Sequence, residues 1–395
     1  MEKPDYNLIS NLRALPATAW ILFFGMFLNK FGGFVVPFLA LYLTHLGYSL
    51  TDAGLCIGAY GVGNLVASFL GGHLADTIGR RKTILLSLFC GAGSMILLSQ
   101  ARTLPELFCL AAVAGLGEFY RPACSALLTD LVPPERRVTA FSAYRMAFNA
   151  GWACGPAAAG FLASHGYLWL FVGDAATTFL FGFVALFALP KHTGVGKASP
   201  EWRETLQVMR RDRKLHQLLL AGLCVAFVLF QMSSTLSLYI TGLGFPLTVY
   251  AGLLSLNGAM VVFCELPLTT ITRRFPARSV MAPGLLLMGL GFACFAFART
   301  IPALAGCMAL FTLGEMVAIP VAAAYLANLS PPHMRGRYAG ANGLTWAVVL
   351  IFAPGVGMRM LAHNAMWLWA SCGALGVLAA GIILVDIREK PVIVA

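Results

Sequence analysis

The chain has 395 residues, of which 59% are hydrophobic and only 11% charged, and its formal net charge is +11. Soluble globular proteins carry about 25% charged residues. The composition therefore excludes an ordinary soluble enzyme and a disordered or fibrous chain. It also argues against a DNA-binding domain, because a basic excess indicates nucleic-acid binding only where it gathers into a patch.

Apolar runs, broken by Gly, Pro and charge clusters, set the predicted elements. A membrane-spanning helix needs about 20 apolar residues. In chain order the expected helices cover 17–45, 50–72, 82–100, 105–131, 138–163, 168–189, 215–242, 247–272, 279–298, 301–328, 337–362 and 365–385. The predicted fold class is an all-α membrane protein with twelve transmembrane helices.

The positions of Lys and Arg predict the orientation. Most of the 27 such residues fall on one side of the predicted helices, and only Arg102, Arg299 and Arg359 lie near the other side. Loops rich in Lys and Arg face the cytoplasm, so both termini are predicted to be cytoplasmic. The net charge then faces anionic lipid rather than nucleic acid. The predicted location is a bacterial inner membrane, with lipid as a partner.

The longest polar loop divides the helices into six and six. We therefore expect an N-terminal half over 1–189, a cytoplasmic linker over 190–214 and a C-terminal half over 215–395. A shift of 198 residues aligns identical residues of the two halves: Pro122 with Pro320, Pro133 with Pro331, Pro134 with Pro332, Arg137 with Arg335, and Pro156 with Pro354. Such a repeat marks two parallel six-helix halves. Within the linker, residues 201–214 are either an amphipathic surface helix or a solvated connection.

The loop after the second predicted helix reads GGHLADTIGRRK over residues 71–82. Its glycines permit a tight turn and close helix approach. The loop resembles the signature G-x-L-A-D-x-x-G-R-[RK]-[RK] of the major facilitator superfamily, and with the twelve helices and the repeat the resemblance covers the whole chain. It implies a latch between the halves on the cytoplasmic side, with a turn that only sets topology as the alternative. The gating residues it implies are Gly72, Asp76, Gly79, Arg80 and Arg81.

Residues 151–160, GWACGPAAAG, resemble the G-x-x-x-G-P-x-x-x-G element of the proton-coupled drug antiporters of that superfamily. Small residues permit close helix packing, and a proline can kink a helix. The resemblance implies export and adds Gly151, Gly155 and Pro156 to the gating residues, with a purely structural role as the alternative. The fourth predicted helix departs from that branch, because Arg121 comes after an acid rather than before a Gly-rich stretch. The coupling residue is therefore left open.

Charged residues inside predicted spans are costly and usually functional. Glu118, Glu315 and Glu265 are the candidates for proton coupling, and the substrate-binding candidates are Lys30, Arg121, Arg145, Asn149, Asn257, Asn342 and Trp346. Glu118 and Arg121 have the i, i+3 spacing of a pair. In the family, helices 1, 4, 7 and 10 line the cavity, which implies one shared cleft for Lys30, Glu118, Arg121 and Glu315. Structural ion pairs between helices are the alternative.

Other polar residues are expected to have simpler roles. Asp52, Asp130 and Asp174 lie near predicted helix ends and are predicted to be interfacial. No histidine pair has metal-ligand spacing, so no metal site is predicted. Enzyme function is not expected, because no nucleophile–base pair or phosphate-binding loop stands out.

These features predict a monomeric secondary transporter that rocks two halves about a midplane site. Burial favours the protonated form of a carboxyl group, so a buried acid can exchange a proton. The first expectation is export of a small amphipathic compound by proton antiport, with the proton gradient in place of a cofactor. One alternative is a proton-coupled uptake symporter for a polar or zwitterionic solute. Another is a non-transporting ligand sensor or a lipid translocator on the same fold.

The balance of charges inside the predicted spans restricts the class of substrate. If all are ionised, Lys30, Arg121 and Arg145 against Glu118 sum to +2, and Glu265 with Glu315 sums to −2. Charges in a low-dielectric cleft interact strongly. The balance favours a zwitterionic or dipolar substrate, or an anionic group on an apolar body, over a plain lipophilic cation.

Overall fold

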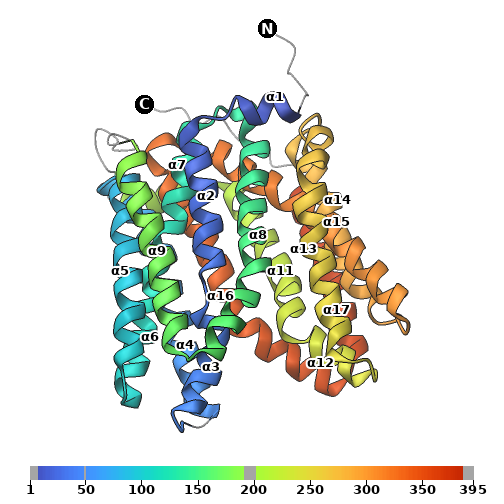
Figure 1. Ribbon diagram of the computed structural model, residues 1–395. Coiled ribbons are helices and arrows are strands. Elements are labelled where there is room, and N and C mark those ends of the chain that lie inside the picture. Colours follow the sequence, from blue (N-terminus) through green and yellow to red (C-terminus); the bar gives the residue numbers. More distant parts are fainter. Residues whose placement is uncertain (1–7, 49, 191–201, 386–395) are drawn as a thin grey trace.

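The computed structural model describes residues 8–48, 50–190 and 202–385, whose regular secondary structure is helical (Figure 1). The α-helices and the short 3₁₀ helices (η) before the linker are α1 (Leu8–Arg13), α2 (Ala17–Phe31), α3 (Val35–His45), α4 (Leu50–Thr77), α5 (Arg80–Gln100), α6 (Leu104–Leu116), η1 (Gly117–Phe119), α7 (Tyr120–Leu131), η2 (Pro134–Arg136), α8 (Arg137–Ser164) and α9 (Leu168–Ala188). Those that follow are α10 (Trp202–Arg211), α11 (Arg213–Ser234), α12 (Leu236–Gly242), α13 (Leu247–Thr272), α14 (Ala277–Cys294), α15 (Ile301–Leu329), η3 (Pro332–Met334), α16 (Arg335–His363) and α17 (Ala365–Leu384).

The helices have the length and the surface of membrane spans. Among the described residues, ten helical segments are long and apolar enough to cross a membrane, and α2 is a shorter apolar helix. The twelve predicted spans correspond to these ten together with α8 and with α2 joined to α3. Phe161, Phe187, Phe263 and Phe297 are 68–76% exposed. Large apolar side chains on the outside suit a bundle surrounded by lipid, in which the hydrocarbon is the solvent.

The prediction of one unbroken helix over 17–45 is wrong. Gly32 and Gly33 separate α2 from α3, and the amide of Phe34 donates to the carbonyl of Gly32 at 2.7 Å in a tight turn. Glycine disfavours a helix by about 1 kcal/mol relative to alanine, so a glycine pair is a weak point. The apolar pattern hides this break, because glycine interrupts no hydrophobic run. The predicted helix over 215–242 is likewise divided, at Thr235, into α11 and α12.

The linker contains the short helix α10, which favours the helical alternative for residues 201–214. Residues 191–201 of the predicted linker lie outside the described part of the chain. One hydrophobic cluster lies within residues 215–383 and another within 34–175. A third joins residues 15–189 with Leu266, Ala324 and Ala327, so apolar packing also links the two parts of the chain. The division into halves at these boundaries stays a prediction.

Figure 1 shows α1, with which the described chain begins, on one side of the bundle, and α3 and α12 at the opposite side. We call these the termini side and the far side. An odd-numbered span therefore begins at the termini side and an even-numbered span returns to it. This places the ends of α4, α7 and α15 and the starts of α8 and α16 together at the termini side.

Candidate functional site

Asp76 connects the two parts of the chain at the termini side. It lies in the last turn of α4, and its carboxylate accepts hydrogen bonds from the backbone amides of Gly336 and Arg337, at 2.9 and 2.8 Å. These amides open α16 and have no partner within their own helix. A carboxylate at a helix N-terminus also interacts favourably with the helix dipole. The predicted gating residue Asp76 is thus a cap on a helix of the other part of the chain.

Arg80 extends this contact. The buried guanidinium donates to Asp76 at 2.5 Å and to Asp130, at the end of α7, at 3.2 Å. Asp130 in turn accepts from Arg335 of α16 at 2.5 Å. We call Asp76, Arg80, Asp130 and Arg335 the termini-side network. It holds α4 and α7 to α16 with alternating charges, so that each buried charge has a partner, as burial requires.

Close helix crossing makes the network possible. A Cβ added to Gly72 would lie 2.5 Å from the carbonyl oxygen of Gly336, and one added to Gly340 would lie 2.8 Å from that of Ser68. Any side chain at these points would push α4 away from α16. Gly72 was predicted as a gating residue, whereas Gly336 and Gly340 were missed, because a glycine inside an apolar run carries no signal without its neighbour.

The remaining residues of the signature loop have different surroundings. Gly79 has a φ of +99°, a conformation that residues with a side chain rarely adopt, and it opens α5. Arg81 donates to the carbonyl oxygen of Leu186 on α9, within the same part of the chain. Gly79 therefore sets the turn, and Arg81 does not join the termini-side network.

The internal repeat contributes a second contact across the two parts. Arg137 donates to Asn328 and to the carbonyl oxygen of Ala327 on α15. The shift of 198 residues that aligns Arg137 with Arg335 also aligns Asp130 with Asn328. The two arginines therefore make related contacts: Arg335 bonds to Asp130 in the first part of the chain, and Arg137 bonds to Asn328 in the second. The sequence analysis predicted Asp130 to lie near the membrane interface, named no partner for it and missed Asn328. The shift of 198 residues, which aligns Asp130 with Asn328, could have identified both.

Lys30 and Glu118 form an ion pair at mid-span. Lys30, in the last turn of α2, lies 3.1 Å from the Glu118 carboxylate in η1. Two glycines of α8 let that helix pack closely against α2, which carries Lys30. A Cβ added to Gly151 would lie 2.5 Å from the backbone of α2, and one added to Gly155 would lie 2.8 Å from it. The predicted close packing by this element is present. Pro156 lies in α8, but its side chain is outside the described part of the structure.

Asp174, which was predicted to be interfacial, is buried inside the bundle. Asp174, on α9, is only 6% exposed, and it accepts a hydrogen bond from the amide of Val35 at 3.3 Å. It therefore caps α3 at the break in the first span. A cavity of about 120 Å³ beside it is lined in part by Asp174, Lys30 and Glu118. The sequence could not show this, because the free amide exists only once the helix is broken.

Arg145 pairs with two acids of the other part of the chain. From α8 it reaches Glu265 on α13 at 2.5 Å and Glu315 on α15 at 2.9 Å. Asn257 donates to the second oxygen of Glu315 at 2.8 Å. Glu265 is fully buried and Glu315 nearly so. The planar guanidinium fork suits two carboxylates at once. We call Arg145, Glu265 and Glu315 the central triad.

These pairings differ from those expected. The i, i+3 pair of Glu118 with Arg121 is absent from the described residues, because Lys30 approaches from α2 and takes the carboxylate. Glu315 lies with Arg145 rather than with Lys30 and Glu118. Arg121 is exposed, makes no hydrogen bond or ion pair within the described ranges, and lies 5.7 Å from the centre of the Phe148 ring.

The other predicted cavity residues take minor positions. The Asn149 amide donates to the carbonyl oxygen of Arg145 on its own helix, at 3.0 Å. Asn342 is half-buried. Trp346 is also half-buried, and its ring meets Phe230 edge to face at 6.3 Å. Their predicted role in substrate binding stays a prediction.

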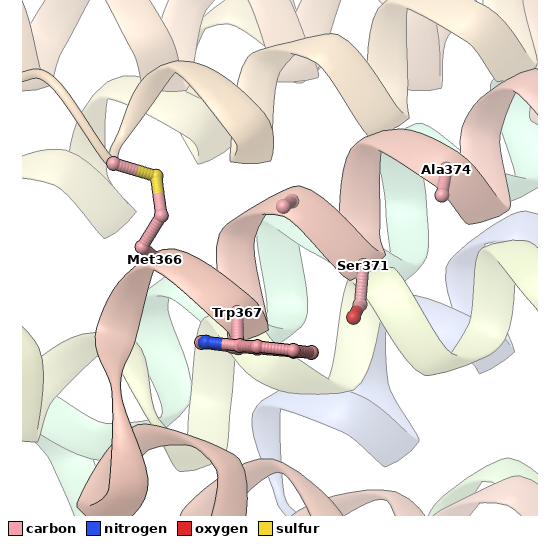
Figure 2. Close-up of a pocket in the computed structure, with 5 residues that line it drawn as sticks. Met366, Trp367, Ser371 and Ala374 are labelled. Carbon is pink, nitrogen blue, oxygen red and sulfur yellow. The ribbon is translucent and has the colours of Figure 1, made fainter.

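A shallow groove on α17 lies away from all these groups. Figure 2 shows Trp367 and Ser371 projecting from the same side of the helix, with Met366 at its start. Trp367 is 65% exposed at the far-side start of α17. An exposed Trp near the end of a span is typical of the membrane interface. The groove contains none of the charged residues within the spans, so we place no function there.

A bundle of apolar helices, joined by polar contacts between two repeated parts and carrying ion pairs at mid-span, is the architecture of a membrane transporter. The family model described as Major Facilitator Superfamily matches residues 22–354 and 251–393. The chain belongs to this superfamily. The predicted family and fold are thereby confirmed, and so is the prediction that the chain is not an enzyme, because the family and the named relatives are transporters.

Known proteins resemble the chain over most of its length. An uncharacterized MFS-type transporter, YqjV of Bacillus subtilis, is 27% identical over 341 residues, which cover 83% of this chain and 82% of the relative. The multidrug resistance protein MdtH of Aeromonas hydrophila is 26% identical over 376 residues, covering 92% and 94%. The human organic anion transporter MFSD10 superposes with a TM-score of 0.72 at 17% identity, covering 92% and 98% of the two chains. This last likeness shows the fold alone.

Proposed function

We propose that the chain exports a small amphipathic compound in exchange for protons, as a monomer in a bacterial inner membrane with its termini side in the cytoplasm. The observation that carries the proposal is the central triad, in which one guanidinium lies between two carboxylates of the other part of the chain. With all three groups ionised, the triad has a surplus of one negative charge. One proton neutralises it, so the triad suits a single coupling proton.

The triad also links that proton to the conformation. Arg145 on α8 joins Glu265 on α13 and Glu315 on α15, and these contacts lie between mid-span and the termini side. A hydrogen bond between charged groups contributes about 1.5–3 kcal/mol. Protonation of either acid weakens its bond to Arg145, and the closed termini side loses stability. The hydrogen bonds that Asp76, Asp130, Arg137 and Arg145 make between the two parts lie at this level or nearer the termini side.

The direction of exchange follows from this coupling. A proton that enters from the far side loosens the triad without any substrate, and the empty protein opens toward the cytoplasm. Loss of the proton there restores both bonds to Arg145, and substrate bound in the meantime is released at the far side when the termini side closes. Protons then move inward as substrate moves outward. The resemblance to a multidrug resistance protein over most of both chains also supports export.

Transport by purified protein in liposomes tests the proposal. Under an imposed pH gradient, substrate should move against the proton flow, whereas movement with the protons would favour the uptake symporter. Glu265→Gln or Glu315→Gln should lose proton-driven flux while exchange of labelled for unlabelled substrate continues. The control is Glu135→Gln, an exposed acid at the termini side with no ion pair in the described residues. If both triad variants keep proton-driven flux, the triad does not carry the proton, and Glu118 is the next candidate.

The proposed orientation has its own test. Reporter fusions after residue 395 should be active in the cytoplasm and inactive outside it. Fusions in the loop between α5 and α6, near Arg102, should show the opposite pattern. The reverse result would place the central triad on the outer side of the membrane and would contradict export by this route.

A further inference from the structure

Of the three cations that the sequence places in the middle of spans, Lys30, Arg121 and Arg145, Arg121 is the one without an ion pair among the described residues. Lys30 is paired with Glu118, and Arg145 with Glu265 and Glu315. Arg121 has no carboxylate at ion-pair distance among the described residues and is exposed. The charge balance expected from the sequence, +2 in the N-terminal half and −2 in the C-terminal half, therefore does not describe the folded protein. The reason is that acids of the other part of the chain neutralise Arg145. One positive charge remains available.

The position of Arg121 shows that it faces the interior. It lies ten residues before the end of α7 at Leu131, which is roughly 15 Å from the termini side at about 1.5 Å per residue. A guanidinium exposed to lipid at that depth would be very unfavourable. Its planar group instead lies 5.7 Å from the centre of the Phe148 ring on α8. The same ring lies 5.8 Å from Nζ of Lys30, so the three side chains form one cluster.

The cluster has the chemistry of an anion site next to an apolar surface. An aromatic ring stabilises a nearby cation without using its N–H groups. The five donors of Arg121 are thus left for a ligand, in the fork that matches a carboxylate or a sulfonate. The half-buried ring of Phe148 offers an apolar contact for the rest of the ligand. A cationic ligand would have to displace Lys30 or Arg145 from an acid, since Glu118, Glu265 and Glu315 already have basic partners.

We propose that Arg121 and Phe148 form the substrate-binding subsite and that the substrate is an organic monoanion with an apolar body. This inference rests on the proposed transport function and names the substrate class of that site. It has an electrical consequence. If one proton enters through the central triad for each monoanion that leaves, each cycle moves two positive charges inward. An inside-negative potential then drives export at equal pH, which an electroneutral exchange of a proton for a monovalent cation would not show.

Binding tests the inference without transport. Three probes share one apolar body: 2-naphthoate, 2-naphthylmethanol and 2-naphthylmethylammonium. Purified full-length protein should bind the naphthoate about tenfold more tightly than the other two, and Arg121→Gln should remove that preference. Arg121→Lys, which keeps the charge without the fork, should keep part of it. Phe148→Leu should weaken all three probes together. The control is Arg210→Gln on α10, in the proposed cytoplasmic linker.

Binding and transport results separate the two proposals. Equal binding of the three probes, or a naphthoate preference unchanged in a folded Arg121→Gln protein, overturns the anion site. If the naphthoate preference depends on Arg121 but no probe moves with the proton gradient, the site stands and the proposed transport fails. If protons drive the ammonium probe rather than the naphthoate, transport stands and the anion site fails. Export of naphthoate driven by potential at equal pH supports both.

Discussion

Replacing Asp76 by asparagine removes the charge at the centre of the termini-side network and keeps the size of the side chain. The carboxylate accepts hydrogen bonds from the amides of Gly336 and Arg337 through different oxygens, and from Arg80. The asparagine carbonyl can replace only one oxygen. Its NH₂ group then faces an N–H donor of α16, so one bond is lost and the other two become weaker.

The magnitude follows from these bonds. A hydrogen bond to a charged group contributes about 1.5–3 kcal/mol, and a neutral one about 1 kcal/mol. Losing one bond and weakening two should therefore destabilise the closed termini side by about 2–3 kcal/mol. That corresponds to a shift of about 30- to 150-fold toward the open state. Asp76 lies in the last turn of α4, whereas the central triad lies on α8, α13 and α15 and Arg121 lies in the first turn of α7, so membrane insertion and substrate contact should be retained.

A distance measurement reads out this shift. Nitroxide labels on cysteines at Ile78 and His333, in a background without the native cysteines, flank the network on the two parts of the chain and are both exposed. In Asp76→Asn the short distance of the closed state should give way to a longer population, and proton-driven flux should fall at least about tenfold. Glu135→Gln makes the same chemical change nearby without a bond to α16 and should alter neither. A wild-type distance distribution together with wild-type flux would refute the latch argument.

Three further changes test other contacts. Gly72→Ala should prevent closure of the termini side, because the new Cβ would lie 2.5 Å from the carbonyl oxygen of Gly336; Gly93→Ala, which has open space around it, should leave the label distances unchanged. Gly155→Ala should lower the melting temperature of the purified protein, because the new Cβ would lie 2.8 Å from a carbonyl oxygen of α2 and overpacking costs about 1–3 kcal/mol; an unchanged Tm would show that α8 yields freely. Arg145→Lys should reduce proton-driven flux about tenfold while substrate exchange continues, because an ammonium cannot hold two carboxylates in a fork; normal coupling would contradict the role of the central triad.

The sequence by itself determined the membrane fold and pointed to contacts on the termini side that both parts of the chain share. Hydropathy and length predicted twelve spans, since a helix satisfies the backbone groups of its own segment in hydrocarbon. The loop over residues 71–82 pointed to Asp76, and the shift of 198 residues already related Arg137 to Arg335. These features are local or repetitive, so they can be read without knowing which helices touch.

Only the tertiary structure decided which charges neutralise one another. Glu118 has a basic residue at i+3, but it pairs with Lys30 of α2 instead. Arg145 pairs with Glu265 and Glu315, which lie more than a hundred residues further along the chain. Asp174 became a helix cap because Gly32 and Gly33 break the first span beside it. Coulomb energy depends on distance and on the surrounding dielectric, and neither is fixed by spacing along the chain. The charge that remains on Arg121 is therefore a property of the folded bundle.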